Sequence, residues 1–227
     1  MISRRQLLYF SILFSVSYPA ANLKCFAESE NPGDESRYPL TQGILKEAYR
    51  VEMVANKYYD AYCQKALSED YPNIAYLFHA LSVSEKIHAT NYQKVLLSLS
   101  STPGEIEVIL SIAETKENLN NATKKELEKI NKFYPEIIQR LSSESNDQAV
   151  MNCMYSWKSH QQHEENIGNI KRYSGIFFGM LAKKIEIMNP NYYVCEICVS
   201  TIDEKPASPC VICNYPEHHY TNIERPI

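Results

Sequence analysis

Four of the seven cysteines stand as two close pairs near the C-terminus. The first pair is Cys195 and Cys198, the second is Cys210 and Cys213, and eleven residues separate the pairs. Four thiolates in this spacing can meet in a tetrahedral cage, the geometry in which thiolates hold zinc or iron. An oxidising compartment would also allow two disulfides. Because pairs of this kind more often bind a metal than cross-link, the spacing predicts a four-cysteine metal site.

Acidic and imidazole groups occupy the apolar faces of four segments with helical periodicity. In chain order they are Glu52, Glu85, His88, Glu126, His160 and His163. A single histidine on such a face is more often a core residue with satisfied hydrogen bonds than a ligand. An unpaired carboxylate in an apolar core, however, costs several kcal/mol, a large part of the stability of an ordinary domain. Six groups on four faces therefore predict metal ions between the helices.

The elements that must position these groups lie in the middle of the chain. Their apolar faces repeat every three or four residues over residues 45–62, 74–95, 119–141 and 150–170. The pattern predicts four helices, with a longer connection between the second and the third. A bundle in which two helices give one Glu each and two give a pair ending in His is typical of ferritin-like carboxylate proteins with two iron or manganese ions. Here His160 replaces one Glu of that pattern.

The composition agrees with a helical protein. The chain has 227 residues, of which 44% are hydrophobic and 22% charged, and this balance excludes a disordered or collagen-like chain. The 27 acidic and 23 basic residues give a net charge of −4, so no basic surface for nucleic acid is expected. Only 6 residues are glycine, which argues against a β protein with many turns. We therefore predict an all-α fold.

An export signal is predicted in residues 1–27. Arg4 and Arg5 precede an apolar run that is short for a membrane span and suits the apolar region of a signal. The paired arginines resemble a twin-arginine signal, which would carry an already folded metalloprotein to the periplasm. An ordinary Sec signal that contains two arginines is the alternative. Cleavage is expected after Ala27.

Nearly the whole chain after this signal resembles the rubrerythrins. Val51-Glu52-Met53 with Tyr59 is similar to the first ligand helix of that family, and the segment from Ser84 to Ala89 is similar to its Glu-x-x-His-Ala motif. Tyr134-Pro135 and the spacing of the six groups also fall in register. The resemblance implies a ferritin-like four-helix bundle with a long crossover at residues 40–188. It also implies a rubredoxin-like domain at residues 189–227, in which four cysteines hold iron.

Two positions depart from the family pattern at the bundle site. The family has Glu-x-x-Glu on the third helix, whereas this chain has Glu126 followed by Lys129. The family has Glu-x-x-His on the fourth helix, whereas this chain has His160 and His163. Two ferrous ions beside a lysine and only three carboxylates would leave excess positive charge in a dry interior. Three arrangements stay open: an asymmetric iron pair with one weakly held ion, a neutral Lys129, or a single metal near Glu52, Glu85 and His88.

The cysteine pairs resemble the two knuckles of rubredoxin, in which glycine usually follows the second cysteine. Here Val199 and Asn214 take that place. A left-handed backbone is costly for a β-branched residue and tolerable for Asn, so we expect a distorted first knuckle, or zinc in place of iron. His218 and His219 are expected at the surface, because the cage already has four donors.

The resemblance implies a peroxidase-type iron protein in which electrons pass from the four-cysteine iron to the bundle. Tyr59 and Tyr134 match family tyrosines and are expected to donate hydrogen bonds at the bundle site, and Lys129 to stabilise the leaving hydroxide. Peroxide and dioxygen both remain open as the substrate, and the electron donor is not identified. A homodimer with electron transfer between subunits is expected by analogy. One alternative is an electron-transfer or metal-binding protein with a mononuclear or inactive bundle site. A scaffold with zinc alone is another.

Overall fold

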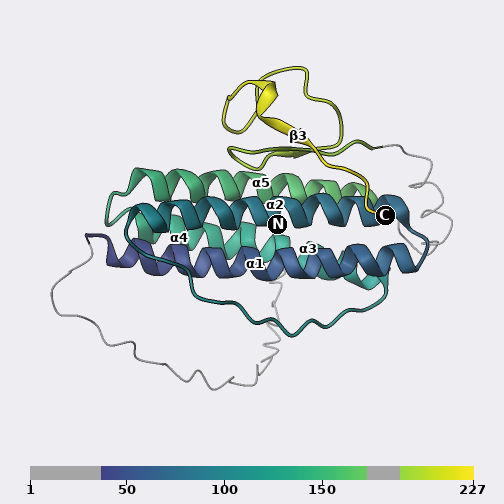
Figure 1. The fold of residues 1–227 in the computed structure, drawn as a ribbon, viewed down its shortest axis with the longest axis horizontal. Helices are drawn as coiled ribbons and strands as arrows, with labels where there is room; N and C mark the ends of the chain where they lie inside the picture. Colours follow the sequence, from purple (N-terminus) through teal and green to yellow (C-terminus); the bar gives the residue numbers. More distant parts are fainter. Residues whose placement is uncertain (1–36, 173–189) are drawn as a thin grey trace, which may run out of the picture. The chain divides into compact units, whose positions relative to one another are not determined.

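The computed structural model describes residues 37–172 and 190–227, without the side chains of 169–172, and these residues belong to one compact unit, Ser36–Ile227. The predicted export signal and residues 173–188 of the predicted bundle domain lie outside the described residues. Within the described part, helices form a bundle and a three-stranded sheet follows (Figure 1). No helix in this part has the combination of length and hydropathy that crossing a bilayer requires.

The first two helices, α1 (Pro39–Ser68) and α2 (Pro72–Ser98), form an antiparallel pair. Each begins with a proline in its first turn, where the missing N–H removes no helical hydrogen bond. A short turn with Asp70 in the left-handed region (φ 62°) joins them, and the helices pack along each other. This hairpin carries Glu52 on α1 and Glu85 with His88 on α2.

A long crossover, residues 99–114, connects α2 to α3 (Thr115–Glu128). Its first carbonyl accepts a hydrogen bond from Gln42 near the start of α1 (3.1 Å). It then runs outside α1, where Lys57 donates to its backbone (2.9 Å) (Figure 1). It ends beside the turn between α1 and α2, where the Thr115 N–H donates to Glu69 (2.9 Å). α3 therefore starts at the same end of the bundle as α2, and the predicted long crossover is confirmed.

The third helical segment covers residues 115–141 without a gap, so the helix predicted over residues 119–141 is present. A π-helical turn, η1 (Lys129–Phe133), separates α3 from α4 (Tyr134–Leu141). In this register the Ile130 carbonyl faces Pro135, which has no N–H to donate. The Trp157 indole donates to that carbonyl instead (2.8 Å). The predicted helix therefore continues through this turn, and Lys129, the first residue of η1, is buried three residues after Glu126.

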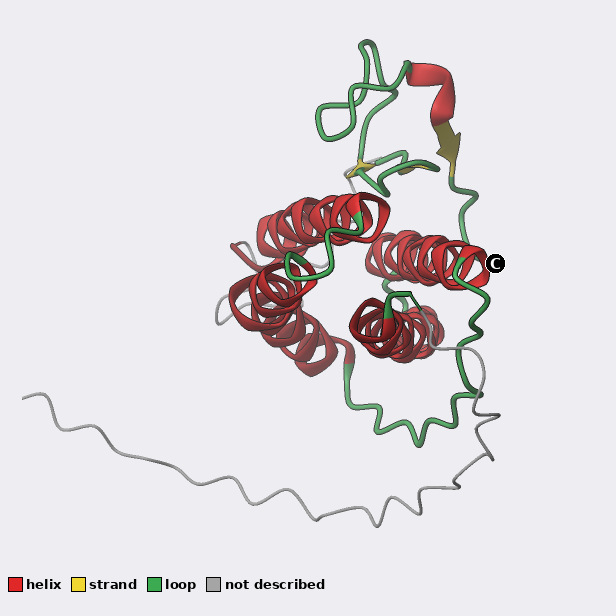
Figure 2. Cartoon of the chain, turned by 90° about the vertical axis from the view of Figure 1, so that its left-hand side faces the viewer, coloured by secondary structure: helices red, strands yellow, loops and turns green. Residues whose placement is uncertain are grey.

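Helix α5 (Asp147–Arg172) packs against α2, α3 and α4, and the view along the bundle shows helices around a common interior (Figure 2). Two apolar clusters fill that interior. One contains Tyr59, Tyr62, Phe78, Leu81, Leu119 and Ile167, and the other contains Ile44, Ala48, Tyr92, Ile137 and Cys153. On every helix the predicted ligands fall between the two clusters, as Glu52 does between Ala48 and Tyr59. The polar groups therefore form one layer between two dry cores.

The C-terminal sheet consists of β1 (Tyr193–Cys195), β2 (Thr201–Ile202) and β3 (Tyr220–Asn222), in the antiparallel order β2-β1-β3. A short 3-10 turn, η2 (Glu217–His219), precedes β3. Ser84 on α2 shares a hydrogen bond with Thr201 (2.8 Å), and the Tyr76 hydroxyl donates to the Ile223 carbonyl. The Arg225 guanidinium lies 4.6 Å from the centre of the Tyr76 ring. These contacts fasten the sheet and the C-terminal tail to α2.

Candidate metal centres

The six predicted bundle ligands come together in the interior, and we call them the bundle centre. They are Glu52 from α1, Glu85 and His88 from α2, Glu126 from α3, and His160 and His163 from α5. His88 is 2% exposed and the other five are fully buried. An interior with three carboxylates and three imidazoles is stable only if each group has a compensating partner. The positions predicted from helical periodicity are thus the positions that converge.

Four of the six groups form a compact donor set. Ligand atoms of Glu85, Glu126, His160 and His163 all lie within 4.8 Å of one another. His160 Nδ1 is 2.7 Å from Glu126 Oε2, and His163 Nδ1 is 3.6 Å from Glu85 Oε1. Two carboxylates and two imidazoles suit iron, manganese or zinc. This set differs from the single-metal arrangement predicted from the sequence, which uses Glu52 and His88 in place of Glu126 and both α5 histidines.

Several buried atoms of the bundle centre have no hydrogen-bond partner. They are Oε2 of Glu85, Nε2 of His88 and Nδ1 of His163, while Oε1 of Glu85 makes no hydrogen bond and has the Lys129 ammonium beside it, at 3.2 Å. Buried polar atoms in proteins are nearly always hydrogen-bonded or bound to a metal. Glu85 and His163 both belong to the four-residue donor set, so the residues present fit a metal ion.

Lys129 occupies the other side of the bundle centre. Its Nζ donates to Glu52 Oε2 at 2.6 Å and lies 3.2 Å from Glu85 Oε1. The second oxygen of Glu52 accepts from the Tyr134 hydroxyl and is 3.2 Å from His160 Nε2. Both oxygens of Glu52 are therefore engaged by side chains of this protein, which explains why Glu52 does not join the four-residue donor set.

The charges of Glu52 and Lys129 stabilise each other. Burial by itself would raise the pKa of Glu52, but the charges of Lys129 and His160 outweigh burial and hold that pKa well below its usual value. Burial would lower the pKa of Lys129, and the carboxylates of Glu52, Glu85 and Glu126 raise it instead. In the metal-free protein Lys129 is therefore an ammonium and Glu52 a carboxylate.

The remaining groups divide into charged and neutral ones. Burial raises the pKa of Glu85 well above its usual value, against the effect of Lys129. Burial opposes ionisation of Glu126 too, but His160 and Lys129 lower its pKa to about 2. Burial and Lys129 disfavour a charged His160, yet the three carboxylates raise its pKa to about 10. Burial lowers the pKa of His163 to about 3. The metal-free centre thus pairs two carboxylates with an ammonium and an imidazolium.

A hydrogen-bonded chain runs behind the bundle centre. The Tyr59 hydroxyl donates to Glu126, as the Tyr134 hydroxyl does to Glu52. Tyr92 donates its one hydroxyl proton to Ser156 (2.6 Å) and lies 3.2 Å from the Tyr134 hydroxyl, and Ser156 lies 2.9 Å from His88 Nδ1. This chain fixes His88 so that its Nε2 faces the centre. Sequence analysis missed Tyr92 and Ser156, although each lies four residues from a histidine of the centre.

The four cysteines of the predicted metal site also come together. Their sulfur atoms all lie within 4.8 Å of one another, with 3.3 Å between Cys198 and Cys210 and 3.8 Å between Cys195 and Cys213. Disulfide sulfurs are about 2.05 Å apart, and none of the six cysteines in the described ranges is cross-linked. A hydrogen bond from Cys198 lowers the pKa of Cys195 to about 5, which favours the thiolate that binds metals.

Both knuckles have the same backbone turn. Val199 (φ 66°) and Asn214 (φ 60°) are left-handed, and their N–H groups donate to the carbonyls of Cys195 and Cys210, each at 2.8 Å. The distortion expected at Val199 is therefore not found. The buried Val199 side chain packs in the apolar cluster with Tyr59 and Phe78, and this packing offsets a left-handed backbone that costs about 1–2 kcal/mol.

A short path of contacts joins the two sites within one chain. The Ser159 hydroxyl on α5 donates to the carbonyl of Val199, next to Cys198 (2.7 Å). His163 Nε2 lies 3.3 Å from the Ser159 hydroxyl and 3.2 Å from that of Thr201. The other nitrogen of His163 faces the bundle centre. Sequence analysis missed Ser159 and Thr201, because their role depends on contact between two domains.

Comparisons with known proteins agree with this architecture. The rubrerythrin family model matches residues 43–170, more than half of the chain. Rubrerythrin-2 of Clostridium acetobutylicum is 26% identical over 176 residues, which cover 77% of this chain and 91% of the relative.

Solved structures share the fold. Fully reduced, all-ferrous nigerythrin has a TM-score of 0.70 at 21% identity, covering 90% of this chain and 95% of that one. Mixed-valence nigerythrin has a TM-score of 0.68 at 22% identity, covering 90% and 94%. A ferritin of M. penetrans has a TM-score of 0.54 at 16% identity, covering 63% and 94%. The predicted ferritin-like bundle followed by a small four-cysteine domain is confirmed. The chain belongs to the rubrerythrin family.

Proposed function

We propose that this protein reduces hydrogen peroxide at the bundle centre, with electrons from iron in the four-cysteine site, and that the bundle centre holds one divalent metal ion beside the Lys129 ammonium. Family membership and the two donor sets make the chain a non-haem iron redox protein. The observation that carries the finer proposal is the position of Lys129, 2.6 Å from Glu52 and 3.2 Å from Glu85.

Charge balance supports a single metal ion. One divalent cation and the Lys129 ammonium carry together as many positive charges as Glu52, Glu85 and Glu126 carry negative ones when ionised. A second divalent ion would leave an excess of two positive charges in a fully buried layer, which is strongly unfavourable at low dielectric. Charge balance therefore supports a single metal ion, held by Glu85, Glu126, His160 and His163 and not near Glu52, Glu85 and His88 as the sequence suggested.

The side chains around the donor set suit peroxide reduction. Breaking the O–O bond of one peroxide takes two electrons and two protons and yields two water molecules. Bound iron would supply electrons at this centre. The Lys129 ammonium is placed to stabilise the hydroxide that leaves. Tyr59 and Tyr134 hold Glu126 and Glu52, and burial raises the pKa of both tyrosines, so they stay protonated donors.

Electrons would enter through the four-cysteine site. The contacts of Ser159 with Val199 and His163 offer a route to the bundle centre within one chain. A homodimer, and export by a twin-arginine signal in residues 1–27, are further parts of the proposal. The mass of the full chain in solution tests the homodimer. A reporter fused to residues 1–27 tests the export signal.

Anaerobic reconstitution with iron, followed by metal analysis and Mössbauer spectroscopy before and after peroxide, tests the proposal. The unchanged chain should bind two irons, one of them in the four-cysteine site, and should oxidise both with peroxide. Lys129→Glu replaces the ammonium with the carboxylate that the family has at this position, and should raise the iron content to three irons per chain. An unchanged iron content in Lys129→Glu would contradict the account of the charges.

The same experiment separates the alternative function. A chain that binds iron at both sites yet leaves peroxide intact would be an electron-transfer or metal-binding protein. A colourless chain that takes only zinc would be a structural scaffold.

A further inference from the structure

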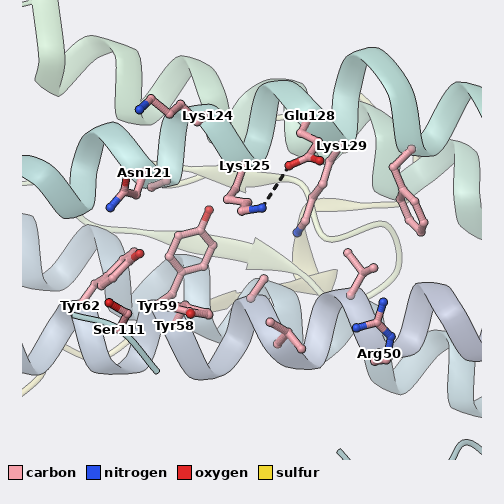
Figure 3. A pocket seen from close by; sticks show the side chains of 15 residues that line it. Arg50, Tyr58, Tyr59, Tyr62, Ser111, Asn121, Lys124, Lys125, Glu128 and Lys129 are labelled. Carbon is pink, nitrogen blue, oxygen red and sulfur yellow. Dashed lines mark hydrogen bonds and ion pairs between the residues drawn. The ribbon is translucent and has the colours of Figure 1, made fainter. Parts of the chain in front are cut away.

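A pocket of about 560 Å³ lies between α1 and the α3–η1 segment. Figure 3 shows Tyr59 reaching up from α1 and Lys125 and Lys129 reaching down from the opposite helix. Ser111 of the crossover also lines it. The pocket is therefore bounded by the crossover as well as by the helices that carry Glu52 and Glu126.

The pocket reaches the bundle centre. Two of its lining residues, Tyr59 and Lys129, hydrogen-bond to carboxylates of that centre, Glu126 and Glu52 respectively. A molecule in the pocket would therefore contact the side chains that hold the candidate ligands. The pocket is a route by which a substrate can meet the centre.

The pocket is larger than hydrogen peroxide requires. A water molecule takes about 30 Å³ in the liquid, and peroxide has only two heavy atoms. Pockets for organic ligands have volumes of roughly 300–1,000 Å³. Most of the wall is apolar or aromatic, from Val51, Val54, Ala55, Tyr58, Tyr62, Ala122 and Phe133. Size and lining both suit an organic molecule with an apolar body.

The charged residues of the pocket are mainly cationic. Arg50, Lys124, Lys125 and Lys129 line it, and Glu128 is the acidic residue among them. Lys125 pairs with Glu128 (3.1 Å), whereas Arg50 and Lys124 form no ion pair with any described residue. These two lie toward opposite ends of the pocket (Figure 3). Unpaired cations beside an apolar wall favour a ligand with a carboxylate group.

From these features we infer that the pocket binds an organic hydroperoxide that carries a carboxylate and an apolar chain. The inference rests on the proposed function and names its substrate class. The hydroperoxide end would lie against Tyr59 and Lys129, and the carboxylate would pair with Arg50 or Lys124. Cleavage of the O–O bond, with two electrons from the two reduced iron sites and two protons from solvent, yields the alcohol and one water molecule.

A binding experiment with substrates that cannot react tests the pocket directly. Titration calorimetry on the full metal-loaded chain should show octanoate binding at least ten times more tightly than 1-octanol. Arg50→Gln together with Lys124→Gln should reduce this preference at least threefold, and Val54→Trp should weaken both ligands by filling the pocket. Lys46→Gln, on the exposed face of α1 outside the pocket, is the matched control and should keep the full preference. Equal affinity for octanoate and octanol in the unchanged chain overturns the inference.

A turnover experiment separates the inference from the proposed function. The second-order rate constant for oxidation of the pre-reduced protein should be at least ten times higher with linoleic acid hydroperoxide than with its methyl ester. Reduction of hydrogen peroxide without that difference overturns the inference and leaves the proposed function standing. Failure to reduce any peroxide, together with octanoate binding, overturns the proposed function and keeps only the anion-binding pocket.

Discussion

Lys129 is a long side chain that ends in the middle of a carboxylate cluster. It is 6% exposed, and its ammonium contacts Glu52 and Glu85, which have no exposed surface. Removing one partner from such a buried pair leaves an uncompensated charge, whereas a metal ion supplies a new partner. The role of Lys129 can therefore be measured as stability as well as activity.

Lys129→Met should lower the free energy of unfolding of the metal-free protein by about 3–5 kcal/mol, because the Glu52 carboxylate stays buried without its ammonium. Urea unfolding followed by circular dichroism measures the change. Lys125→Met, at a side chain that is 69% exposed, is the control and should change stability by less than about 0.5 kcal/mol. Equal effects of the two substitutions would show that the Lys129 pair is not stabilising.

Metal binding at the bundle centre should release protons. The pKa of His160 is raised to about 10, so this histidine is protonated at pH 7 and must lose its proton to become a ligand. Burial also raises the pKa of Glu85, so protonated Glu85 adds to the release as the pH falls. Apparent affinity should therefore rise with pH, about tenfold per pH unit for each proton released.

Calorimetry in buffers of different ionisation enthalpy counts these protons. The four-cysteine site is first filled with zinc, so that only the bundle centre titrates. Binding without proton release at pH 7 would mean that His160 is not a ligand.

The positions of the six ligands could be predicted because helical periodicity alone decides which residues share a face. Glu52, for example, lies in register with Ala48 and Tyr59 on the inner side of α1. The partner of Lys129 could not be predicted in this way. A flexible side chain can reach several neighbours, and only the folded structure shows that it reaches Glu52.

At the scale of the elements, the π turn η1 begins at the buried Lys129 and leads into α4. The apolar pattern of residues 119–141 continues through the turn and gives no sign of it. Pro135 is a local signal, since proline within a helical pattern removes one backbone donor. Its effect depends on Trp157 from α5, which satisfies the Ile130 carbonyl. A contact with another helix thus fixes a feature that the segment alone leaves undetermined.

The start of α1 is capped by a residue far away in the sequence. Glu144, in the turn before α5, accepts hydrogen bonds from the N–H groups of Leu40 (3.0 Å) and Thr41 (2.8 Å). Burial slightly opposes its charge, but these N–H groups lower the pKa of Glu144. The carboxylate therefore stabilises the folded state at neutral pH.

Glu144→Ala should lower the free energy of unfolding by about 1 kcal/mol at pH 7, as expected for the loss of a helix cap. Because the folded-state pKa is the lower one, the stabilisation is present above the unfolded value of about 4.3 and is lost as the pH falls through the folded value. Chemical unfolding at pH 7 and pH 3 measures this. Glu136→Ala, at a 69% exposed side chain on α4, is the control. An undiminished difference at pH 3 would contradict capping by the carboxylate.

At the scale of the whole molecule, the two metal sites depend on different kinds of stabilisation. The bundle has two apolar clusters, whereas the C-terminal sheet has strands of only three, two and three residues. Such short strands give little cooperative stability. In small domains of this type, metal binding supplies folding free energy.

Removing the metal from the four-cysteine site under reducing conditions should therefore unfold the sheet and leave the bundle folded. Hydrogen exchange is expected to accelerate in residues 193–222, while amides of α2 near Leu77 and Leu81 keep their protection. Cys210→Ser should give the same pattern without a chelator. Protection of the sheet in the metal-free chain would show that contacts with α2 are sufficient to fold it.

The folds of the bundle and of the four-cysteine domain could be predicted from the spacing of apolar residues and cysteines. The contact between the two domains could not. The four-cysteine domain was expected by analogy to meet the bundle of another subunit. Within one chain, the Ser159 hydroxyl donates to the Val199 carbonyl, and the Thr201 N–H donates to the Gln162 side chain on α5. Helical periodicity and cysteine spacing act within a domain and carry no information about which bundle a domain packs against.

Lys129 carries a positive charge but, unlike a second iron ion, cannot change its oxidation state. In the proposed one-metal centre, an iron ion that moves between the ferrous and ferric states yields a single electron, whereas cleavage of a peroxide consumes a pair. The second electron then has to come from the iron of the four-cysteine site within the same catalytic cycle, along the contacts of Val199, Ser159 and His163. One chain would thus hold the two electrons that one peroxide needs, one at the bundle centre and one at the four-cysteine site.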